Sequence, residues 1–266
     1  MKILDYALAL DIGNGDITSN ALFSKNHKTK AAIFAKSSGT LAGAEEAKYL
    51  FAKCGAKARI LKRDGTCIKK GEKVITITGP TRAVLEAERT ALNILSRMSG
   101  IATETSKMAK HCVVAATRKT GPGLALLDKK AVEIGGGVSH RLGLWDMTLI
   151  KDTHLDSMKM PRRKAIKEAL AKAKPPVEIE VESKAEALLA ATLGADIVML
   201  DNFSPAKAKA TVKELNKKYP DVCIELSGGI NKKNIRAYAK AGADYVSLGA
   251  LTHTVKPLDF SMKIIK

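Results

Sequence analysis

The sequence has few aromatic residues, few cysteines and no long apolar run. Phe, Trp and Tyr make up 4% of its 266 residues, and the four cysteines form no C-x-x-C pair. Such scattered cysteines indicate neither a zinc site nor a dense disulfide framework. No stretch approaches the ~20 apolar residues of a membrane span, and no cleavage site follows the N-terminal apolar run. We therefore expect a soluble cytoplasmic protein with reduced thiols and no membrane partner.

Acidic residues are also scarce, because 27 Asp and Glu face 45 Lys and Arg, which gives a formal net charge of +18. Such a charge attracts polyanions, nucleic acid included. However, many lysines between Lys207 and Lys218 alternate with apolar residues, as they do on the outer face of an amphipathic helix. No helix-turn-helix, zinc-finger or RNP pattern accompanies the charge. We expect no nucleic-acid partner, and a non-catalytic polyanion binder is kept as an alternative.

From about residue 110 onward, short apolar strands alternate with amphipathic helices, which implies a parallel sheet. Ser183 begins a capping box and Ser204-Pro205 a second helix. An open doubly wound sheet and a closed barrel both fit this alternation. Polar residues follow many different strands and converge most easily if the sheet closes, so we predict an α/β fold with an incomplete, TIM-like barrel. The expected strands are 113–117, 148–151, 177–182, 197–201, 223–227 and 245–249.

Residues 1–103 do not follow this rhythm and indicate a separate α/β unit. Strands are expected at 30–36, 57–61 and 74–78. Helices are expected at 42–53 and 81–98, and the second should end at Gly100 acting as a C-cap. The tail after His253 is too short to fold alone and should pack back on this unit.

The strand at 177–182 carries glutamates at alternating positions. Glu178, Glu180 and Glu182 share one face, opposite Ile179 and Val181. If the apolar face meets the helices, the carboxylates point into the barrel, where they need a cation, a metal or substrate hydroxyls as partners. A solvated edge strand is the alternative. Asp201, at the end of the next apolar run, is the expected partner of Glu180.

Cationic residues gather around glycine-rich turns between residues 117 and 151, and they predict a ligand with several negative groups. A solvated basic surface is the alternative. Glycines also follow the last two strands, where barrels often bind phosphate through backbone N–H groups at a helix start. No histidine has metal-ligand spacing. The cationic group comprises Arg118, Lys119, His140, Arg141 and Lys151, and the phosphate group Ser227, Gly228, Gly229 and Gly249.

Five motifs are spread along essentially the whole chain. They are Ala87-Glu88-Arg89-Thr90-Ala91-Leu92-Asn93, Thr117-Arg118-Lys119-Thr120, Gly135-Gly136-Gly137-Val138-Ser139-His140-Arg141, Ile150-Lys151-Asp152 and Leu200-Asp201-Asn202. In this order they resemble the quinolinate phosphoribosyltransferase family. The resemblance implies an N-terminal α/β sandwich domain at 1–103, onto which residues 254–266 pack back, and a catalytic α/β barrel at 104–253. It also implies a homodimer or an assembly of dimers.

The reaction implied by the resemblance transfers the phosphoribosyl group of phosphoribosyl pyrophosphate to quinolinate. Decarboxylation then gives nicotinate mononucleotide, pyrophosphate and CO2 in de novo NAD biosynthesis. The implied cofactor is Mg²⁺, bound with the pyrophosphate near Glu180 and Asp201. A fold relative of the molybdenum-transport-associated type, acting on a different acid, is the alternative.

The resemblance also implies roles for individual residues. The implied catalytic residues are Glu180, Asp201, Lys119 and Lys151. Glu180 and Asp201 would hold the ribose hydroxyls and stabilise oxocarbenium character as pyrophosphate leaves. Arg89 would reach the quinolinate pocket from the partner subunit. The implied substrate-binding residues are Arg89, Thr117, Arg118, Lys119, His140, Arg141, Lys151, Glu180, Asp201, Ser227, Gly228, Gly229 and Gly249.

Overall fold

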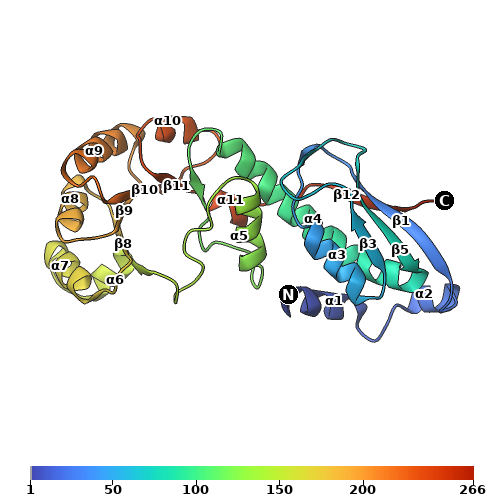
Figure 1. The fold of residues 1–266 in the computed structure, drawn as a ribbon. Helices are drawn as coiled ribbons and strands as arrows, with labels where there is room; N and C mark the ends of the chain where they lie inside the picture. The colour runs from blue at the N-terminus through green and yellow to red at the C-terminus, as the bar shows by residue number, and fades with distance from the viewer. Residues whose placement is uncertain (1) are drawn as a thin grey trace. The chain divides into compact units, whose positions relative to one another are not determined.

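The structure, a computed structural model, describes residues 2–266, and the chain divides into two compact units (Figure 1). The first contains the chain up to Lys107 together with residues 120–136 and 254–266. The second contains residues 108–119 and 137–253. The segment 120–136, which the sequence-based division assigns to the barrel, therefore groups with the first unit.

The first unit is built on a four-stranded antiparallel sheet in the order β12-β1-β5-β3. The C-terminal tail supplies the edge strand β12, so residues distant in sequence close this sheet. Helix α3 packs on β3 and β5 through its buried residues Ala47, Leu50 and Phe51. The strands are β1 (Lys28–Ala35), β3 (Lys57–Ile60), β5 (Lys73–Pro80) and β12 (Phe260–Ile264), with a separate pair β2 (Gly39–Thr40) and β4 (Cys67–Ile68). The helices are α1 (Lys2–Ile12), α2 (Ile17–Leu22), α3 (Ala44–Lys53), α4 (Thr81–Met108) and α5 (Ala125–Ile134).

Helix α4 does not end at Gly100 but continues to Met108. The expected C-cap is therefore wrong, and the reason is a close approach of two backbones. A Cβ at position 100 would overlap the carbonyl oxygen of Lys256 and would lie 3.0 Å from the Cα of Pro257. Gly135 is used in the same way, because its Cβ would lie 2.6 Å from the carbonyl oxygen of Ala102 on α4. Both glycines allow close packing on α4. Gly100 lies inside α4 and caps no helix, whereas Gly135 is also the C-cap of α5.

The second unit is a six-stranded, wholly parallel sheet in the order β6-β11-β10-β9-β8-β7. Beyond β6, Val138 adds one isolated parallel bridge to Ala115. This parallel sheet therefore forms the wall of a barrel in which some strands are short and others are missing. The predicted mixed α/β fold with an incomplete barrel is confirmed. The strands are β6 (Val114–Ala115), β7 (Thr148–Ile150), β8 (Val177–Val181), β9 (Ile197–Asp201), β10 (Cys223–Ser227) and β11 (Tyr245–Ser247).

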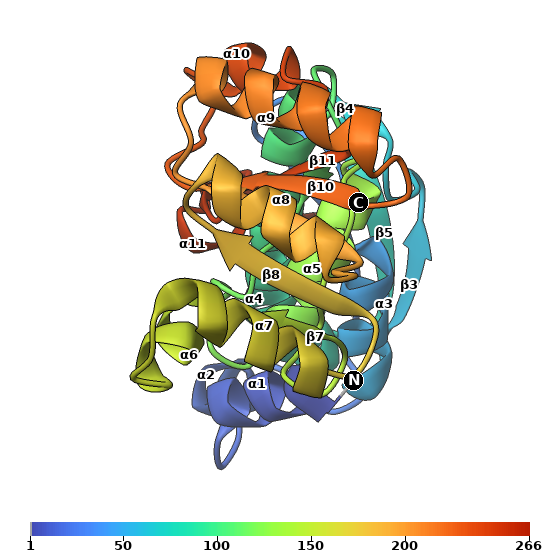
Figure 2. The same cartoon turned by 90° about the vertical axis from the view of Figure 1, so that its left-hand side faces the viewer.

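Helices cover the outer side of this sheet, and α7, α8 and α9 lie across its strands in Figure 2. The two predicted helix starts are confirmed. The Ser183 hydroxyl accepts a hydrogen bond from the Glu186 backbone N–H, and the Ser204 hydroxyl accepts one from that of Lys207. The helices are α6 (Asp152–Ser157), α7 (Arg162–Lys172), α8 (Lys184–Thr192), α9 (Pro205–Lys218), α10 (Ile235–Ala239) and α11 (Ala250–His253).

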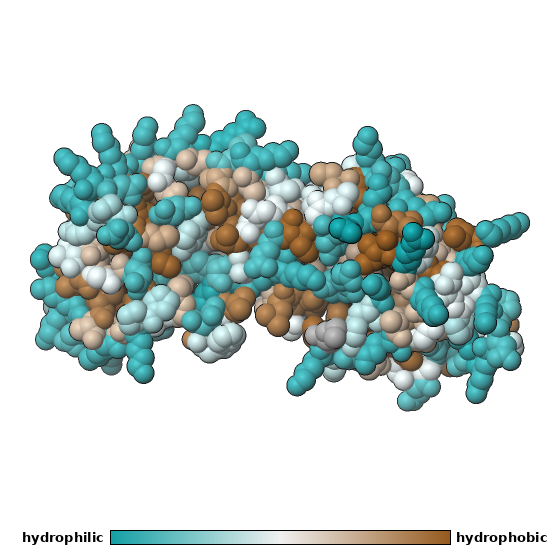
Figure 3. All heavy atoms as spheres, viewed as in Figure 1, coloured by the Kyte–Doolittle hydropathy of each residue, from teal (hydrophilic) through white to brown (hydrophobic). Residues whose placement is uncertain are grey.

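Helix α9 accounts for part of the lysine excess. Its residues Ala208, Val212 and Leu215 are buried, whereas its lysines are exposed and belong to the hydrophilic surface in Figure 3. The expectation that these lysines form the solvent face of an amphipathic helix is confirmed. Within residues 2–266, no helix is both long enough and apolar enough to span a membrane.

Candidate active site

Side chains on the inner face of the barrel lie in register across neighbouring strands. Glu180 on β8 pairs with Met199 on β9, Met199 with Glu225 on β10, and Glu225 with Tyr245 on β11. Ile179 on the opposite face is fully buried, as expected if that face meets the helices. Glu180 is only 9% exposed, which excludes the solvated edge strand.

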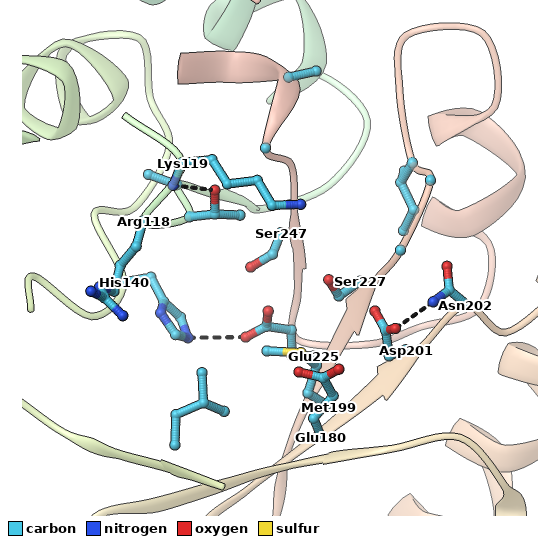
Figure 4. Close-up of a pocket in the computed structure, with 18 of the residues that line it drawn as sticks. Arg118, Lys119, His140, Glu180, Met199, Asp201, Asn202, Glu225, Ser227 and Ser247 are labelled. Atoms are coloured by element: carbon cyan, nitrogen blue, oxygen red, sulfur yellow. Dashed lines mark hydrogen bonds and ion pairs between the residues drawn. The ribbon is translucent and has the colours of Figure 1, made fainter. Parts of the chain in front are cut away.

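A cavity of about 610 Å³ lies at the carboxyl ends of these strands (Figure 4). Every predicted substrate-binding residue except Arg89 lines it. Arg89 is exposed on α4 of the first unit, and its contribution from a partner subunit stays a prediction. The predicted residues at the cavity are Thr117, Arg118, Lys119, His140, Arg141, Lys151, Glu180, Asp201, Ser227, Gly228, Gly229 and Gly249.

Two guanidinium groups give the cavity its anion-binding character. Arg118 is exposed after β6, whereas Arg141 is 6% exposed and donates from Nη1 to the carbonyl oxygen of Met147 at 3.2 Å. Burial and the like charge of Arg118 lower the pKa of Arg141. A bound anion would relieve this repulsion, so the pair favours a carboxylate or phosphate ligand.

Lys119 is fixed through its backbone. The Thr252 hydroxyl donates to the Lys119 carbonyl oxygen at 2.8 Å, and the Lys119 N–H donates to the Thr117 hydroxyl at 3.1 Å. Gly249 leaves room for the lysine stem, because a Cβ there would lie 3.0 Å from the Cδ of Lys119. The amine is thus carried on an anchored backbone at the mouth of the cavity.

Carboxylates lie across the cavity from Arg118 in Figure 4. The Lys151 ammonium is 3.4 Å from Oε2 of Glu180. Burial raises the pKa of Glu180; Lys151 opposes this shift, and Asp201 adds to it. Burial also raises the pKa of Asp201, while a hydrogen bond from Ser227 lowers it. Both carboxylates line the cavity, and their oxygens suit a hard cation or sugar hydroxyls. Their joint role in the site stays a prediction.

His140 meets two further carboxylates at the wall of the cavity. Its Nε2 lies 3.1 Å from Oε2 of Glu178 and 3.0 Å from Oε2 of Glu225. Burial lowers the pKa of His140, but the two carboxylates outweigh burial and raise it to about 9. Burial and the neighbouring Glu225 raise the pKa of Glu178 to about 7 against the opposing effect of His140. The inward-facing glutamate expected to need a partner therefore meets a histidine cation.

The same three residues form a group whose potential metal-ligand atoms all lie within 4.8 Å of one another. His140 supplies one positive charge to this group, and the raised pKa of Glu178 reduces the negative charge that has to be balanced, so the group has an explanation without a metal. Glu182, the third glutamate of the predicted face, lies beyond the end of β8 and is exposed.

The glycines after β10 have a packing role that the sequence argument did not assign. Gly228 has φ +89°, and a Cβ there would overlap Oδ1 of Asn202 and lie 2.5 Å from its backbone nitrogen. The Asn202 side-chain amide donates to the Asp201 carboxylate, so this contact bears on Asp201. The next helix, α10, starts only at Ile235 and has five residues. The predicted phosphate site would therefore rely on loop N–H groups and would lack the helix dipole that was expected.

Sequence reasoning missed Glu225 and Asn202, which also line the cavity. A signal for Glu225 was present, because Cys223, Glu225 and Ser227 alternate on β10 as the glutamates do on β8. Asn202 stands in the motif Leu200-Asp201-Asn202, but the motif gives it no role of its own. Its φ of +55° and its contact with Gly228 exist only once β9 and β10 are adjacent.

Comparison with known proteins agrees with this geometry. The family model for the N-terminal domain of quinolinate phosphoribosyl transferase matches residues 16–99, and the C-terminal domain model matches residues 101–263. The chain is 40% identical to a probable nicotinate-nucleotide pyrophosphorylase [carboxylating] of Archaeoglobus fulgidus, covering 95% of this chain and 99% of that protein. It is 38% identical to a protein of the same description from Bacillus subtilis, covering 99% and 92%.

Solved structures lead to the same family. The crystal structure of NadC from Streptococcus pyogenes matches with a TM-score of 0.90 and 36% identity, over 100% of this chain and 96% of that one. Both parts of the chain, the sheet closed by its own tail and the incomplete barrel, are included in that match. The chain therefore belongs to the quinolinate phosphoribosyl transferase family.

Proposed function

We propose that this protein transfers the phosphoribosyl group of phosphoribosyl pyrophosphate to quinolinate, with decarboxylation, as the carboxylating enzyme of de novo NAD biosynthesis. The observation that carries the proposal is one cavity in which cationic side chains face a pair of carboxylates, Glu180 and Asp201. The cations match the negative groups of both substrates, and the carboxylates match the positive charge that develops on the ribose.

Quinolinate has two carboxylates, and the cationic side of the cavity offers more than one group to each. Arg118 and Arg141 provide planar donors suited to carboxylates, and His140 and Lys151 add further positive charge. The repulsion that lowers the pKa of Arg141 is relieved when an anion binds. These residues would bind quinolinate and orient its ring nitrogen toward C1 of the ribose.

Transfer requires pyrophosphate to leave as the ring nitrogen attacks, and positive charge develops on the ribose ring in that step. Glu180 and Asp201 lie where they would accept hydrogen bonds from ribose hydroxyls and stabilise this charge. Lys119, on its anchored backbone, would contact the phosphoribosyl donor. Lys151, 3.4 Å from Glu180, would hold that carboxylate in place beside the quinolinate pocket.

The carboxylates of Glu180 and Asp201 fit Mg²⁺, because oxygen donors whose ionisation is disfavoured by burial and by neighbouring carboxylates gain from a hard cation. With the pyrophosphate, they would hold the ion. When bound, Mg²⁺ neutralises charge on the leaving pyrophosphate.

The 5′-phosphate would bind at the loops after β10 and β11. Ser227 offers a hydroxyl, and Gly228, Gly229 and Gly249 allow backbone N–H groups to approach the phosphate oxygens. CO2 would then leave from the ring carbon next to the nitrogen of the quinolinium nucleotide. The positive nitrogen stabilises the electron pair left on that carbon, and a proton from water completes the product.

We assign these steps to the barrel, residues 104–253 in the sequence-based division, and the partner-facing role to the N-terminal domain. Arg89 would enter the quinolinate pocket of a neighbouring subunit in a homodimer or an assembly of dimers. The enzyme would act in the cytoplasm on these small molecules, without nucleic-acid or membrane partners.

The test is direct turnover. Purified protein is incubated with quinolinate, phosphoribosyl pyrophosphate and Mg²⁺, and nicotinate mononucleotide, pyrophosphate and CO2 are measured. Product formation at equal stoichiometry is expected. Failure to exceed an enzyme-free control would refute the assignment, and turnover of another aromatic acid in place of quinolinate would favour a fold relative with a different substrate.

A further inference from the structure

His140 lies at the cavity wall with one ring nitrogen enclosed by two carboxylates. Nε2 is within 3.1 Å of Oε2 of both Glu178 and Glu225, and Figure 4 shows the contact with Glu225. Both glutamates are 0% exposed, whereas the His140 side chain retains 11% exposure and lines the cavity. The imidazole therefore lies between two buried carboxyl groups and the substrate space.

Neither glutamate has another counter-charge as close. Within the described part of the chain, the carboxylate oxygens of both and Nε2 of His140 are buried and make no hydrogen bond of good geometry, so the three side chains interact through charge at 3.0 and 3.1 Å. Burying such groups without a cation is strongly unfavourable. They sit on different strands, β8 and β10, and converge on His140 from two directions. This convergence fixes the ring position as well as its charge.

The charge state of His140 decides what its second nitrogen can do. In a neutral ring whose Nε2 carries the proton facing the carboxylates, Nδ1 is an acceptor and repels a carboxylate ligand. In the imidazolium, Nδ1 also carries a proton and donates to such a ligand. Two buried carboxylates around Nε2 favour the imidazolium.

We propose that Glu178 and Glu225 are positioning residues for substrate recognition, which hold His140 as an imidazolium so that Nδ1–H donates to a carboxylate of the acid substrate. This proposal rests on the proposed function for the identity of that acid. Neither glutamate touches the substrate; both act through His140.

Three further observations support it. The pKa of His140 is raised to about 9 despite its burial, so the ring stays charged at neutral pH. Its backbone has φ +50°, an unfavourable conformation for a residue other than glycine, which indicates that surrounding contacts fix it. The Tyr245 ring lies 5.7 Å from the imidazole, centroid to centroid, and closes another side.

Neutral, isosteric variants test the proposal: Glu178→Gln, Glu225→Gln and the double variant, with Glu182→Gln as the matched control on the exposed end of the same segment. We expect the KM for quinolinate to rise about 10- to 100-fold, the range for losing one charge-assisted hydrogen bond. The KM for phosphoribosyl pyrophosphate should change less than twofold, and E182Q should match wild type. Folded variants with an unchanged KM for quinolinate would overturn the proposal.

A measurement on the wild-type protein covers the case in which these variants do not fold. Nitrogen-15 NMR of the imidazole, assigned with His140→Gln, should show both ring nitrogens of His140 protonated at pH 7.5. A neutral ring would overturn the proposal. So would stoichiometric Zn²⁺ binding that E225Q abolishes, since a metal on Nε2 excludes the proton. The NMR result stands whether or not the protein turns over quinolinate, so the two failures are distinguishable.

Discussion

At the scale of single residues, burial and one or two neighbours set the charge states in the cavity. Burial alone would favour neutral Glu180 and Asp201, and Lys151 and Ser227 act against this effect. Arg141 keeps its charge beside Arg118 at the cost of a lowered pKa. Without a ligand, both the cationic side chains and the carboxylates of the site are thus electrostatically unfavourable, and substrates of complementary charge relieve this.

The pKa of His140 predicts how substrate binding depends on pH. Because the folded pKa, about 9, lies above the ordinary 6.5, His140 is charged at pH 7 and loses its proton as pH rises through about 9. Glu178, Glu225 and Tyr245 are the titratable groups around it. We expect the Kd of quinolinate, measured by calorimetry, to rise as the pH passes through about 9 and His140 loses its proton. H140Q should lack this rise; an identical pH profile in H140Q would contradict the prediction.

Gly228 offers a second test at this scale. Gly228→Ala would push Asn202, and with it the Asp201 carboxylate that Asn202 contacts. We expect kcat to fall at least about tenfold, since catalysis is sensitive to displacements of about 1 Å. Gly242→Ala is the control: it has φ +80° and would meet nothing within 4 Å, so it carries backbone strain alone. Equal effects of the two substitutions on kcat would count against this account.

At the scale of secondary-structure elements, α4 and the C-terminal tail act as one structure. The tail strand β12 closes the sheet beside β1, and the Leu258 N–H donates to the Ser96 carbonyl oxygen on α4 at 3.0 Å. One turn further along α4, the tail backbone at Lys256 closely approaches Gly100. The stability of the first unit therefore depends on residues at both ends of the chain.

Gly100→Ala tests this coupling, because two effects of opposite sign compete. Helix propensity favours alanine by about 1 kcal/mol, whereas forcing a methyl group against the Lys256 backbone costs about 1–3 kcal/mol or more. We expect a net loss, visible as a Tm lowered by several degrees. The control is Gly55→Ala, at φ +94° with nothing within 4 Å. A raised Tm for G100A would show that the tail yields at little cost.

At the scale of the whole molecule, the two compact units carry different parts of the proposed function. The barrel holds the cavity, while Arg89 lies exposed on the first unit. The net charge of +18 belongs in part to solvated lysines such as those of α9, so it does not indicate nucleic-acid binding. Association with DNA at low salt should therefore vanish at moderate salt, as weak phosphate contacts do.

Subunit mixing tests the proposed role of Arg89. Arg89→Ala and Glu180→Ala proteins, each inactive alone, should regain activity after being unfolded and refolded together. Mixed dimers would contain one site with both residues intact, which limits recovery to about a quarter of wild-type activity per subunit if pairing is random. Refolded single variants serve as controls. No recovery, despite mixed dimers detected by mass, would contradict an arginine shared between subunits.

Several features of the site were predictable because their signals are local. The alternation in Glu178-Ile179-Glu180 predicts a strand with carboxylates on its inner face, and Ser183 and Ser204 mark helix starts that the structure contains. Gly100 shows the limit of such signals. A glycine in a helical pattern is equally compatible with a cap and with a close contact, and the contacting segment at Lys256 is distant in sequence.

The sequence by itself determined the fold class, the family and most of the charged residues at the strand ends. Periodicity and motifs depend only on residues that are close together in the chain. Only the tertiary structure decided that Glu178 and Glu225 meet on His140, that Gly228 packs on Asn202, and that residues 120–136 group with the first unit. These facts depend on strand order and register, which bring together residues far apart in the chain. Burial then sets their charge, and burial exists only in the folded protein.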